Sequence, residues 1–220
     1  PKDVEEIYLG AEGVLAAKEG GIVIDMTTSS PALAKKIFAA AKERGVAALD
    51  APVSGGDIGA RDATLAIMVG GEREAFERCK DLFAVLGKTA RYFGVAGSGQ
   101  FVKMSNQIAI ASNMLGVAEA MAYAKKSGLD ALAVQQTIAG GAAGSWSLTN
   151  LAPKMLAGDW SPGFFIKHFL KDMRIAVESA EEMELDLPGL KLAKKLYEEL
   201  SARGMEDCGT QAIFCWYEGE

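Results

Sequence analysis

A change of pattern near residue 95 constrains the fold of this chain more than any other feature of its sequence. Before that point, short apolar runs typical of buried strands alternate with helical segments. These runs cover residues 21–26, 46–50, 65–71 and 90–93. From Gly97 onward the sequence indicates helices and no convincing strand. We therefore predict an α/β part over residues 1–95 and an all-helical part over residues 96–220.

Local signals mark several helix ends. Ser30 before Pro31 combines a hydroxyl N-cap with proline at the first helical position, and Gly45 suits the end of the same helix. Because this helix lies between two short strands, the order predicts a parallel α/β unit. Further helices are predicted over residues 4–17, 72–86, 100–127, 130–139, 145–157, 165–184 and 188–203, with a short one near residue 211.

Composition excludes several classes of function. The 23 basic and 29 acidic residues give a formal net charge of −6, which argues against a nucleic-acid or anionic-membrane partner. Charges interrupt every apolar run before it reaches the length of a membrane span. The three cysteines form no CxxC pair, so we expect no disulfide framework and no zinc site, and a reducing compartment such as the cytoplasm fits. The single histidine, His168, excludes a metal site built from several histidines.

The first candidate for a functional site is the segment Asp50-Ala51-Pro52-Val53-Ser54-Gly55-Gly56. It follows a predicted strand, and open α/β sheets bind ligands beyond the carboxyl ends of their strands. Two glycines after a serine allow backbone N–H groups to turn toward a bound anion, and the serine hydroxyl adds a donor. The alternative is a tight turn without a ligand.

The second candidate opens the long predicted helix, with the sequence Gly-Ser-Gly-Gln-Phe-Val-Lys-Met-Ser-Asn-Gln over residues 97–107. Lys103, Asn106 and Gln107 lie three and four positions apart, so they share one helix face. Apolar neighbours on either side of Lys103 favour burial of the amine, and a buried lysine can exchange protons as an acid or base. The alternative is a solvated lysine in the first turns of a helix.

Two weaker candidates remain. His168, Lys171 and Asp172 lie close together on a predicted helix, where Lys171 can bind a carboxylate or a phosphate; the alternative is a solvated face with local ion pairs. Hydroxyl groups follow the first strand over residues 27–30, although helix capping already explains Ser30. The three tryptophans, Trp146, Trp160 and Trp216, are interpreted as core or interface residues.

Taken together, these motifs resemble the β-hydroxyacid dehydrogenase family, which includes 3-hydroxyisobutyrate dehydrogenase and 2-hydroxy-3-oxopropionate reductase and, more distantly, 6-phosphogluconate dehydrogenase. The resemblance rests on the segments 50–56 and 97–107 and on Lys171-Asp172 after Pro-Gly-Phe, in the family's order and spacing. It implies a partial Rossmann-type NAD(P)-binding domain over residues 1–95. A helical domain like that of 6-phosphogluconate dehydrogenase follows over residues 96–220, joined to the first by the long helix.

The resemblance also implies roles for the candidate residues. Lys103 is the catalytic acid and base, while the substrate carboxylate binds Ser54, Gly55 and Gly56, with Asn106 and Gln107 as polar partners. A glutamine at position 107, where many members have asparagine, favours the 2-hydroxy-3-oxopropionate reductase branch. The substrate is then a small anionic hydroxyacid or semialdehyde, and we expect a homodimer or homotetramer.

The cofactor implied by the resemblance is NAD or NADP, contacted by Thr28, Phe164 and Lys171. The family begins with a glycine-rich pyrophosphate-binding turn that this sequence lacks, so we expect roughly 60–70 preceding residues, about two strand–helix units. We expect the chain alone to bind the cofactor poorly and to be inactive. Two alternatives keep the fold: a non-catalytic scaffold, which the presence of Lys103 disfavours, and an imine reductase.

Overall fold

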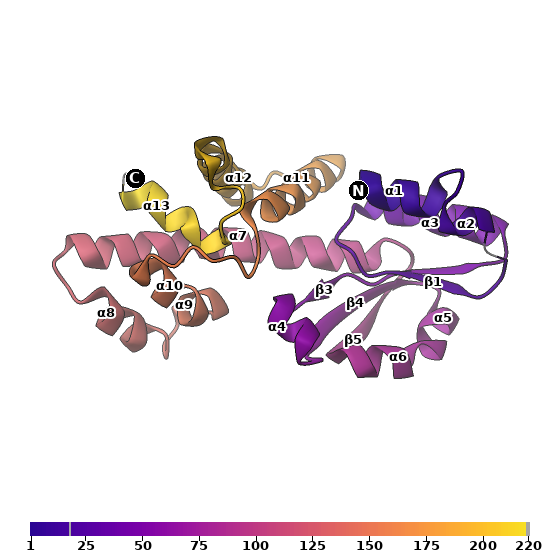
Figure 1. Cartoon of the computed structure of the whole chain (residues 1–220), viewed down its shortest axis with the longest axis horizontal. Helices are drawn as coiled ribbons and strands as arrows, with labels where there is room; N and C mark the ends of the chain where they lie inside the picture. The colour runs from indigo at the N-terminus through magenta and orange to yellow at the C-terminus, as the bar shows by residue number, and fades with distance from the viewer. Residues whose placement is uncertain (18, 219–220) are drawn as a thin grey trace. The chain divides into compact units, whose positions relative to one another are not determined.

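The computed structural model describes residues 1–17 and 19–218. The chain divides into two compact units, Pro1–Asn106 and Gln107–Glu220. The first combines a β-sheet with helices and the second is helical, which confirms the predicted fold class (Figure 1). The boundary between the units falls within α7 (Ser98–Lys126), the longest helix.

The first unit is built on a five-stranded mixed sheet. Its strands are β1 (Ile22–Asp25), β2 (Ala47–Asp50), β3 (Val53–Ser54), β4 (Leu65–Gly71) and β5 (Gly87–Gly94). β1 and β2 are parallel, as the strand–helix–strand order predicts, and β4 and β5 are also parallel. β4 runs antiparallel to both β2 and β3.

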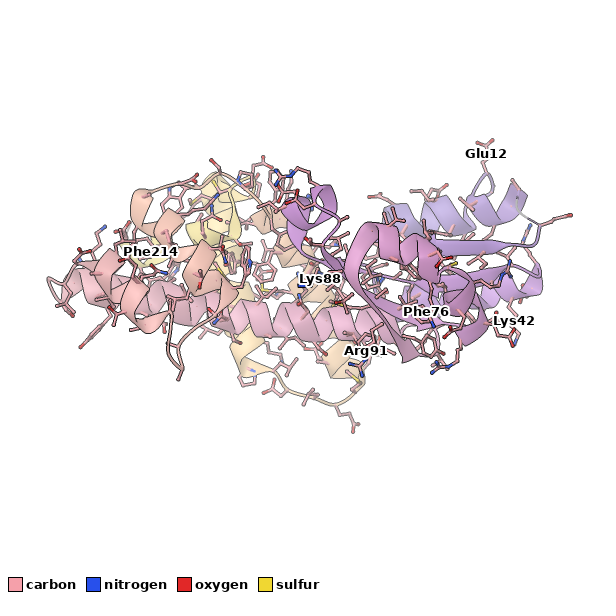
Figure 2. The ribbon with its side chains drawn as sticks, turned by 90° about the horizontal axis from the view of Figure 1, so that it is seen from below. Glu12, Lys42, Phe76, Lys88, Arg91 and Phe214 are labelled. Atoms are coloured by element: carbon pink, nitrogen blue, oxygen red, sulfur yellow. The ribbon has the colours of Figure 1, made fainter. Side chains whose placement is uncertain are left out.

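Helices cover both faces of this sheet (Figure 1). The first unit contains α1 (Lys2–Leu9), α2 (Val14–Ala17), α3 (Pro31–Glu43), α4 (Gly56–Arg61), α5 (Arg73–Arg78) and α6 (Lys80–Leu86). One core lies between the sheet and α2 and α3, and it includes Leu15 and Ile37. The other lies between the sheet and α5 and α6, where the rings of Phe76 and Phe83 stack with centroids 6.0 Å apart (Figure 2).

The predicted ends of α3 agree with the structure. The Ser30 hydroxyl accepts a hydrogen bond from the Leu33 N–H, Pro31 takes the first helical position, and Gly45 follows the helix with a φ of +65°. The predicted single helix over residues 72–86 was wrong, because the backbone leaves helical geometry at Cys79. The turn expected after Val53 is also more structured than predicted, since it comprises β3 and α4.

In the second unit, the remainder of α7 is followed by α8 (Ala131–Ile138), α9 (Trp146–Asn150), α10 (Ala152–Ala157), α11 (Ile166–Glu182), α12 (Pro188–Leu200) and α13 (Phe214–Glu218). A π-helical turn over Ser201–Met205 and a 3-10 turn over Thr210–Ile213 complete it. The helix predicted over residues 145–157 is divided at Leu151, because Pro153 opens a new helix. None of the helices in the described residues is both long and apolar enough to cross a membrane.

The core of the second unit gathers large apolar side chains from several helices. Met114, Phe169, Tyr197 and Phe214 are fully buried, and the rings of Phe169 and Tyr197 meet edge to face with centroids 5.3 Å apart (Figure 2). The expectation for the tryptophans requires a correction, because the side chain of Trp146 is 66% exposed and therefore lies outside this core.

Candidate functional site

The start of α7 is held by Asp50, the last residue of β2. Its Oδ1 accepts a hydrogen bond from the Gly97 N–H at 2.8 Å, and its Oδ2 accepts one from the Gln100 N–H at 2.9 Å. A buried carboxylate from the sheet thus satisfies N–H groups that the first turn of a helix leaves without intrahelical partners. Burial raises the pKa of Asp50, although these backbone hydrogen bonds oppose the shift.

Two glycines allow α7 to begin directly against the sheet. A Cβ at Gly70 of β4 would lie 2.6 Å from the Asp50 Oδ1 atom and 2.7 Å from the Gly99 nitrogen. A Cβ at Gly99 would clash with the carbonyl oxygens of Met68 and Asp50. The close approach of helix and strands therefore requires both residues to lack a side chain.

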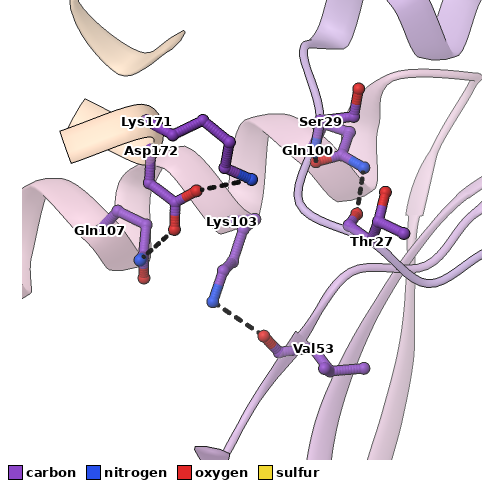
Figure 3. Close-up of polar contacts among 8 residues, drawn as sticks. All are labelled: Thr27, Ser29, Val53, Gln100, Lys103, Gln107, Lys171 and Asp172. Carbon is purple, nitrogen blue, oxygen red and sulfur yellow. Dashed lines mark hydrogen bonds and ion pairs between the residues drawn. The ribbon is translucent and has the colours of Figure 1, made fainter. Parts of the chain in front are cut away.

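Lys103 lies one turn further along α7 and is buried, with 8% of its surface exposed. Its Nζ donates a hydrogen bond to the Val53 carbonyl oxygen at 2.8 Å (Figure 3). Val53 directly precedes Ser54, so the amine lies at the serine–glycine turn. The structure thus brings together two motifs that are fifty positions apart in the sequence.

The turn itself has a special backbone. Gly55 and Gly56 have φ values of +135° and +64°, which favour glycine, and Gly56 is exposed with open space where a Cβ would stand. The Ser54 hydroxyl lies 3.5 Å from the Asn106 Oδ1 atom, at the limit of a hydrogen bond. Ser54, Asn106 and Lys103 therefore all lie beside this turn in the first unit.

A further residue of α7 holds the segment that follows β1. Gln100 is completely buried, and its Oε1 accepts a hydrogen bond from the Ser29 N–H at 3.0 Å. Its Nε2 donates to the Thr27 carbonyl oxygen at 2.9 Å (Figure 3). The peptide groups on both sides of Thr28 are therefore fixed by one side chain. Sequence reasoning did not assign Gln100 a role, and its place inside the glycine-rich motif was the only available signal.

In the second unit, Asp172 of α11 joins two of the predicted residues. Its Oδ2 accepts a hydrogen bond from the Gln107 Nε2 at 2.7 Å, and its Oδ1 pairs with the Lys171 Nζ at 3.1 Å (Figure 3). Asp172 is 2% exposed, so the alternative of a solvated helix face is wrong for this residue. Lys171 is half-buried beside it.

The two aromatic neighbours of this pair are more exposed. Phe164 lies just before α11, is 37% exposed and tilts against Phe169 with ring centroids 5.7 Å apart. His168 is exposed and meets the edge of Phe165, so it packs against the surface of its own helix. Among the described residues, no group of three or more His, Cys, Asp or Glu side chains could hold a metal ion.

These groups suit proton exchange next to a nicotinamide cofactor. A buried amine oriented by a carbonyl oxygen can give a proton to, or take one from, a substrate oxygen. The hydroxyl-bearing residues Thr27 and Thr28 follow the carboxyl end of β1, which pairs in parallel with β2, and this is the edge where α/β sheets bind ligands. Thr27 is exposed there, and its N–H is fixed by the Asp25 carboxylate at 3.0 Å. The residues present therefore fit such a cofactor.

Comparison with protein families assigns each part of the chain to a known domain type. Residues 1–97 match the family described as the NAD binding domain of 6-phosphogluconate dehydrogenase. Residues 97–217 match the family described as NAD-binding of NADP-dependent 3-hydroxyisobutyrate dehydrogenase. At the level of the family, these matches confirm the prediction of NAD or NADP as the cofactor.

Individual proteins show the same similarity. The chain is 62% identical over 215 residues to the uncharacterized oxidoreductase YkwC of Bacillus subtilis, covering 97% of this chain and 75% of that protein. It is 41% identical over 202 residues to 2-hydroxy-3-oxopropionate reductase of Escherichia coli, covering 91% of this chain and 69% of that protein. Among solved structures, 3-hydroxyisobutyrate dehydrogenase of Mycobacterium tuberculosis with L-serine matches with a TM-score of 0.87 and 30% identity, covering 96% of this chain and 75% of that one.

Proposed function

The chain belongs to the β-hydroxyacid dehydrogenase family, and from this premise we propose that it uses NAD or NADP to interconvert a small β-hydroxyacid and its semialdehyde or keto form. Relatives named as 2-hydroxy-3-oxopropionate reductase and 3-hydroxyisobutyrate dehydrogenase support this substrate class. We assign residues 1–95 to the C-terminal portion of the NAD(P)-binding domain. Residues 96–220 form the helical domain of the 6-phosphogluconate dehydrogenase type.

The observation that carries this proposal is the hydrogen bond between the Lys103 amine and the Val53 carbonyl oxygen. It places a buried proton-exchanging group at the turn that binds the substrate carboxylate in this proposal. Ser54 donates from its hydroxyl, and Gly55 and Gly56 contribute backbone N–H groups. Fixing the carboxylate orients the reacting carbon, which removes much of the entropic cost of the reaction.

Lys103 moves the proton. In the oxidation direction its neutral amine takes the proton from the substrate hydroxyl, and in the reduction direction its ammonium gives a proton to the carbonyl oxygen. The Val53 carbonyl oxygen accepts from the Nζ and so holds the amine toward the turn. Asn106 and Gln107, three and four positions further along α7, supply amide groups for the substrate.

The remaining predicted residues serve the cofactor. A bound nicotinamide supplies or accepts the hydride. Thr28 contributes its hydroxyl at the end of β1, Lys171 contributes a cation, and Phe164 contributes an exposed ring. Asp172 holds both Lys171 and Gln107 at its two carboxylate oxygens, so the charge of Lys171 is fixed in place.

Substitution of Lys103 tests the proposal directly. In enzyme produced from its complete gene, we expect Lys103→Ala to lower kcat at least about 100-fold while the Kd of the cofactor changes little. Lys126→Ala is the matched control, because Lys126 lies at the exposed end of the same helix. The assay follows cofactor absorbance with a panel of short β-hydroxyacids and, for the imine reductase alternative, a cyclic imine. Turnover of the hydroxyacids by Lys103→Ala within tenfold of wild type would refute the assignment.

We also propose that the enzyme is a homodimer or homotetramer. Exposed apolar side chains of the second unit support this, among them Tyr123 and Trp146, which are 76% and 66% exposed. Light scattering during size-exclusion chromatography measures the mass of the assembly, and a monomer at working concentration would contradict the proposal.

A further inference from the structure

Gln100 makes an unusual pair of contacts for a side chain in a helix. Its carboxamide bonds to the Thr27 carbonyl oxygen and to the Ser29 N–H, which are the backbone groups on either side of Thr28. A carboxamide has one donor side and one acceptor side, so it pairs with this backbone as a neighbouring strand would. Both contacts have ordinary lengths and both belong to the first unit, which shows a preformed clamp (Figure 3).

The clamp spans elements that the sequence places far apart. Gln100 lies 73 positions after Thr27, and its own N–H is bound by the Asp50 carboxylate. Gln100 also precedes Lys103 by three positions on α7, so the two side chains leave nearly the same face of the helix. The segment around Thr28 and the amine of Lys103 are thus both referred to one rigid helix turn.

We propose that Gln100 is a positioning residue that holds Thr28 for the nicotinamide cofactor. The inference rests on the proposed function, because it takes the role of Thr28 in cofactor binding from there. Without the carboxamide, the Thr27 carbonyl and the Ser29 N–H lose their partners, and the segment must be ordered when the cofactor binds. Ordering a segment upon binding weakens affinity.

The first experiment measures the Kd of NADH and NADPH by fluorescence titration of enzyme produced from its complete gene. Gln100→Met keeps the shape of the side chain and removes both hydrogen bonds, and we expect it to raise Kd about tenfold. The matched control is Gln135→Met. It removes another buried carboxamide, whose Nε2 donates to the Leu148 carbonyl oxygen in the second unit, and we expect it to leave Kd within twofold.

A double-mutant cycle with Thr28→Ala tests whether Gln100 acts through Thr28. If it does, Gln100→Met has little further effect on Kd once Thr28→Ala is present. Full additivity of the two changes would overturn the inference, and so would an equal Kd for Gln100→Met and Gln135→Met. Failure of the proposed function looks different, because Lys103→Ala would then retain turnover and Thr28→Ala would bind the cofactor normally.

A second variant keeps the inference testable if Gln100→Met fails to fold. In Gln100→Glu one carboxylate oxygen still accepts from the Ser29 N–H, while the other faces the Thr27 carbonyl oxygen and repels it. Protonation converts that oxygen into a donor and restores the pair. We therefore expect the Kd of Gln100→Glu to approach the wild-type value as the pH is lowered, and a Kd ratio that does not change with pH would overturn the inference.

Discussion

Replacing Asp50 by alanine removes both acceptors that hold the start of α7, and we expect the first unit to lose stability. The two N–H groups of Gly97 and Gln100 would remain buried, and the methyl group of alanine offers them no partner. Because α7 carries Lys103 one turn later, loosening its first turn also loosens the position of the amine.

The magnitude follows from the contacts. Each buried N–H left without a partner costs about 1–3 kcal/mol, so two of them cost about 2–6 kcal/mol. Burial of the carboxylate offsets part of this, as the raised pKa of Asp50 indicates, and we expect a net loss of about 2–4 kcal/mol. Asp50→Asn retains one acceptor oxygen and is expected to cost less, about 1–2 kcal/mol.

Hydrogen exchange followed by mass spectrometry is the suitable assay, because it resolves peptides covering residues 97–103. Tryptophan fluorescence gives a separate readout of the second unit, since all three tryptophans lie beyond residue 106. Asp130→Ala is the matched control: Asp130 caps α8 with the same chemistry, accepting from the N–H groups of Leu132 and Ala133, but it is exposed. We expect it to cost about 1 kcal/mol and to leave exchange at residues 97–103 unchanged.

The pH dependence supplies an independent check. A raised pKa means that folded Asp50 keeps its proton at pH values where the unfolded chain has already released it. The free energy of unfolding that Asp50 contributes therefore falls as the pH rises from its ordinary pKa toward its raised one. Asp50→Asn lacks this dependence. Wild-type exchange at residues 97–103 in Asp50→Ala, or a difference between wild type and Asp50→Asn that is constant with pH, would refute the reasoning.

Three further predictions concern the site, the packing and the tyrosines. Ser54→Ala should raise the KM of the hydroxyacid about tenfold with little change in the KM of the cofactor, because it removes one donor to the carboxylate; steady-state kinetics measure both. Gly99→Ala should destabilise the first unit, since its Cβ would clash with the Met68 and Asp50 carbonyl oxygens, and thermal unfolding followed by circular dichroism measures the loss. Burial raises the pKa of Tyr8 and of Tyr217 to about 12, with Asp25 and Glu119 adding to the shift. Stability should therefore fall as the pH rises from 10 to about 12, where the unfolded chain releases protons that the folded chain holds, and tyrosinate absorbance of Tyr8→Phe and Tyr217→Phe identifies the two groups.

Elements with local signals were predictable from the sequence. The start of α3 at Ser30-Pro31 and its end before Gly45 depend on capping and on backbone preferences of the residues themselves. The apolar run over residues 65–71 is β4 to the residue, because a fully buried strand leaves a continuous apolar pattern.

Features that depend on distant neighbours were not predictable in the same way. The break at Cys79 interrupts an apolar spacing that suits one continuous helix, so the pattern alone concealed it. The short strand β3 exists only because Val53 and Ser54 pair with Ile67 and Ala66 of β4. Two residues are too few to show a period of alternation, and nothing local marks their partner.

The same distinction explains what the sequence revealed about the candidate site. Lys103, Ser54 and Lys171 carry groups that suit chemistry on an anionic substrate, so residue type alone made them candidates. Asp50 and Gln100 carry equally polar groups, yet their partners are backbone atoms of other elements, and residue type does not identify such partners. Their contacts also explain why both motifs extend beyond the residues that could touch a ligand: Asp50 opens one motif and caps the helix that the other begins. The two motifs are therefore halves of one structural unit, and a substitution at either positioning residue should be felt at the Lys103 amine.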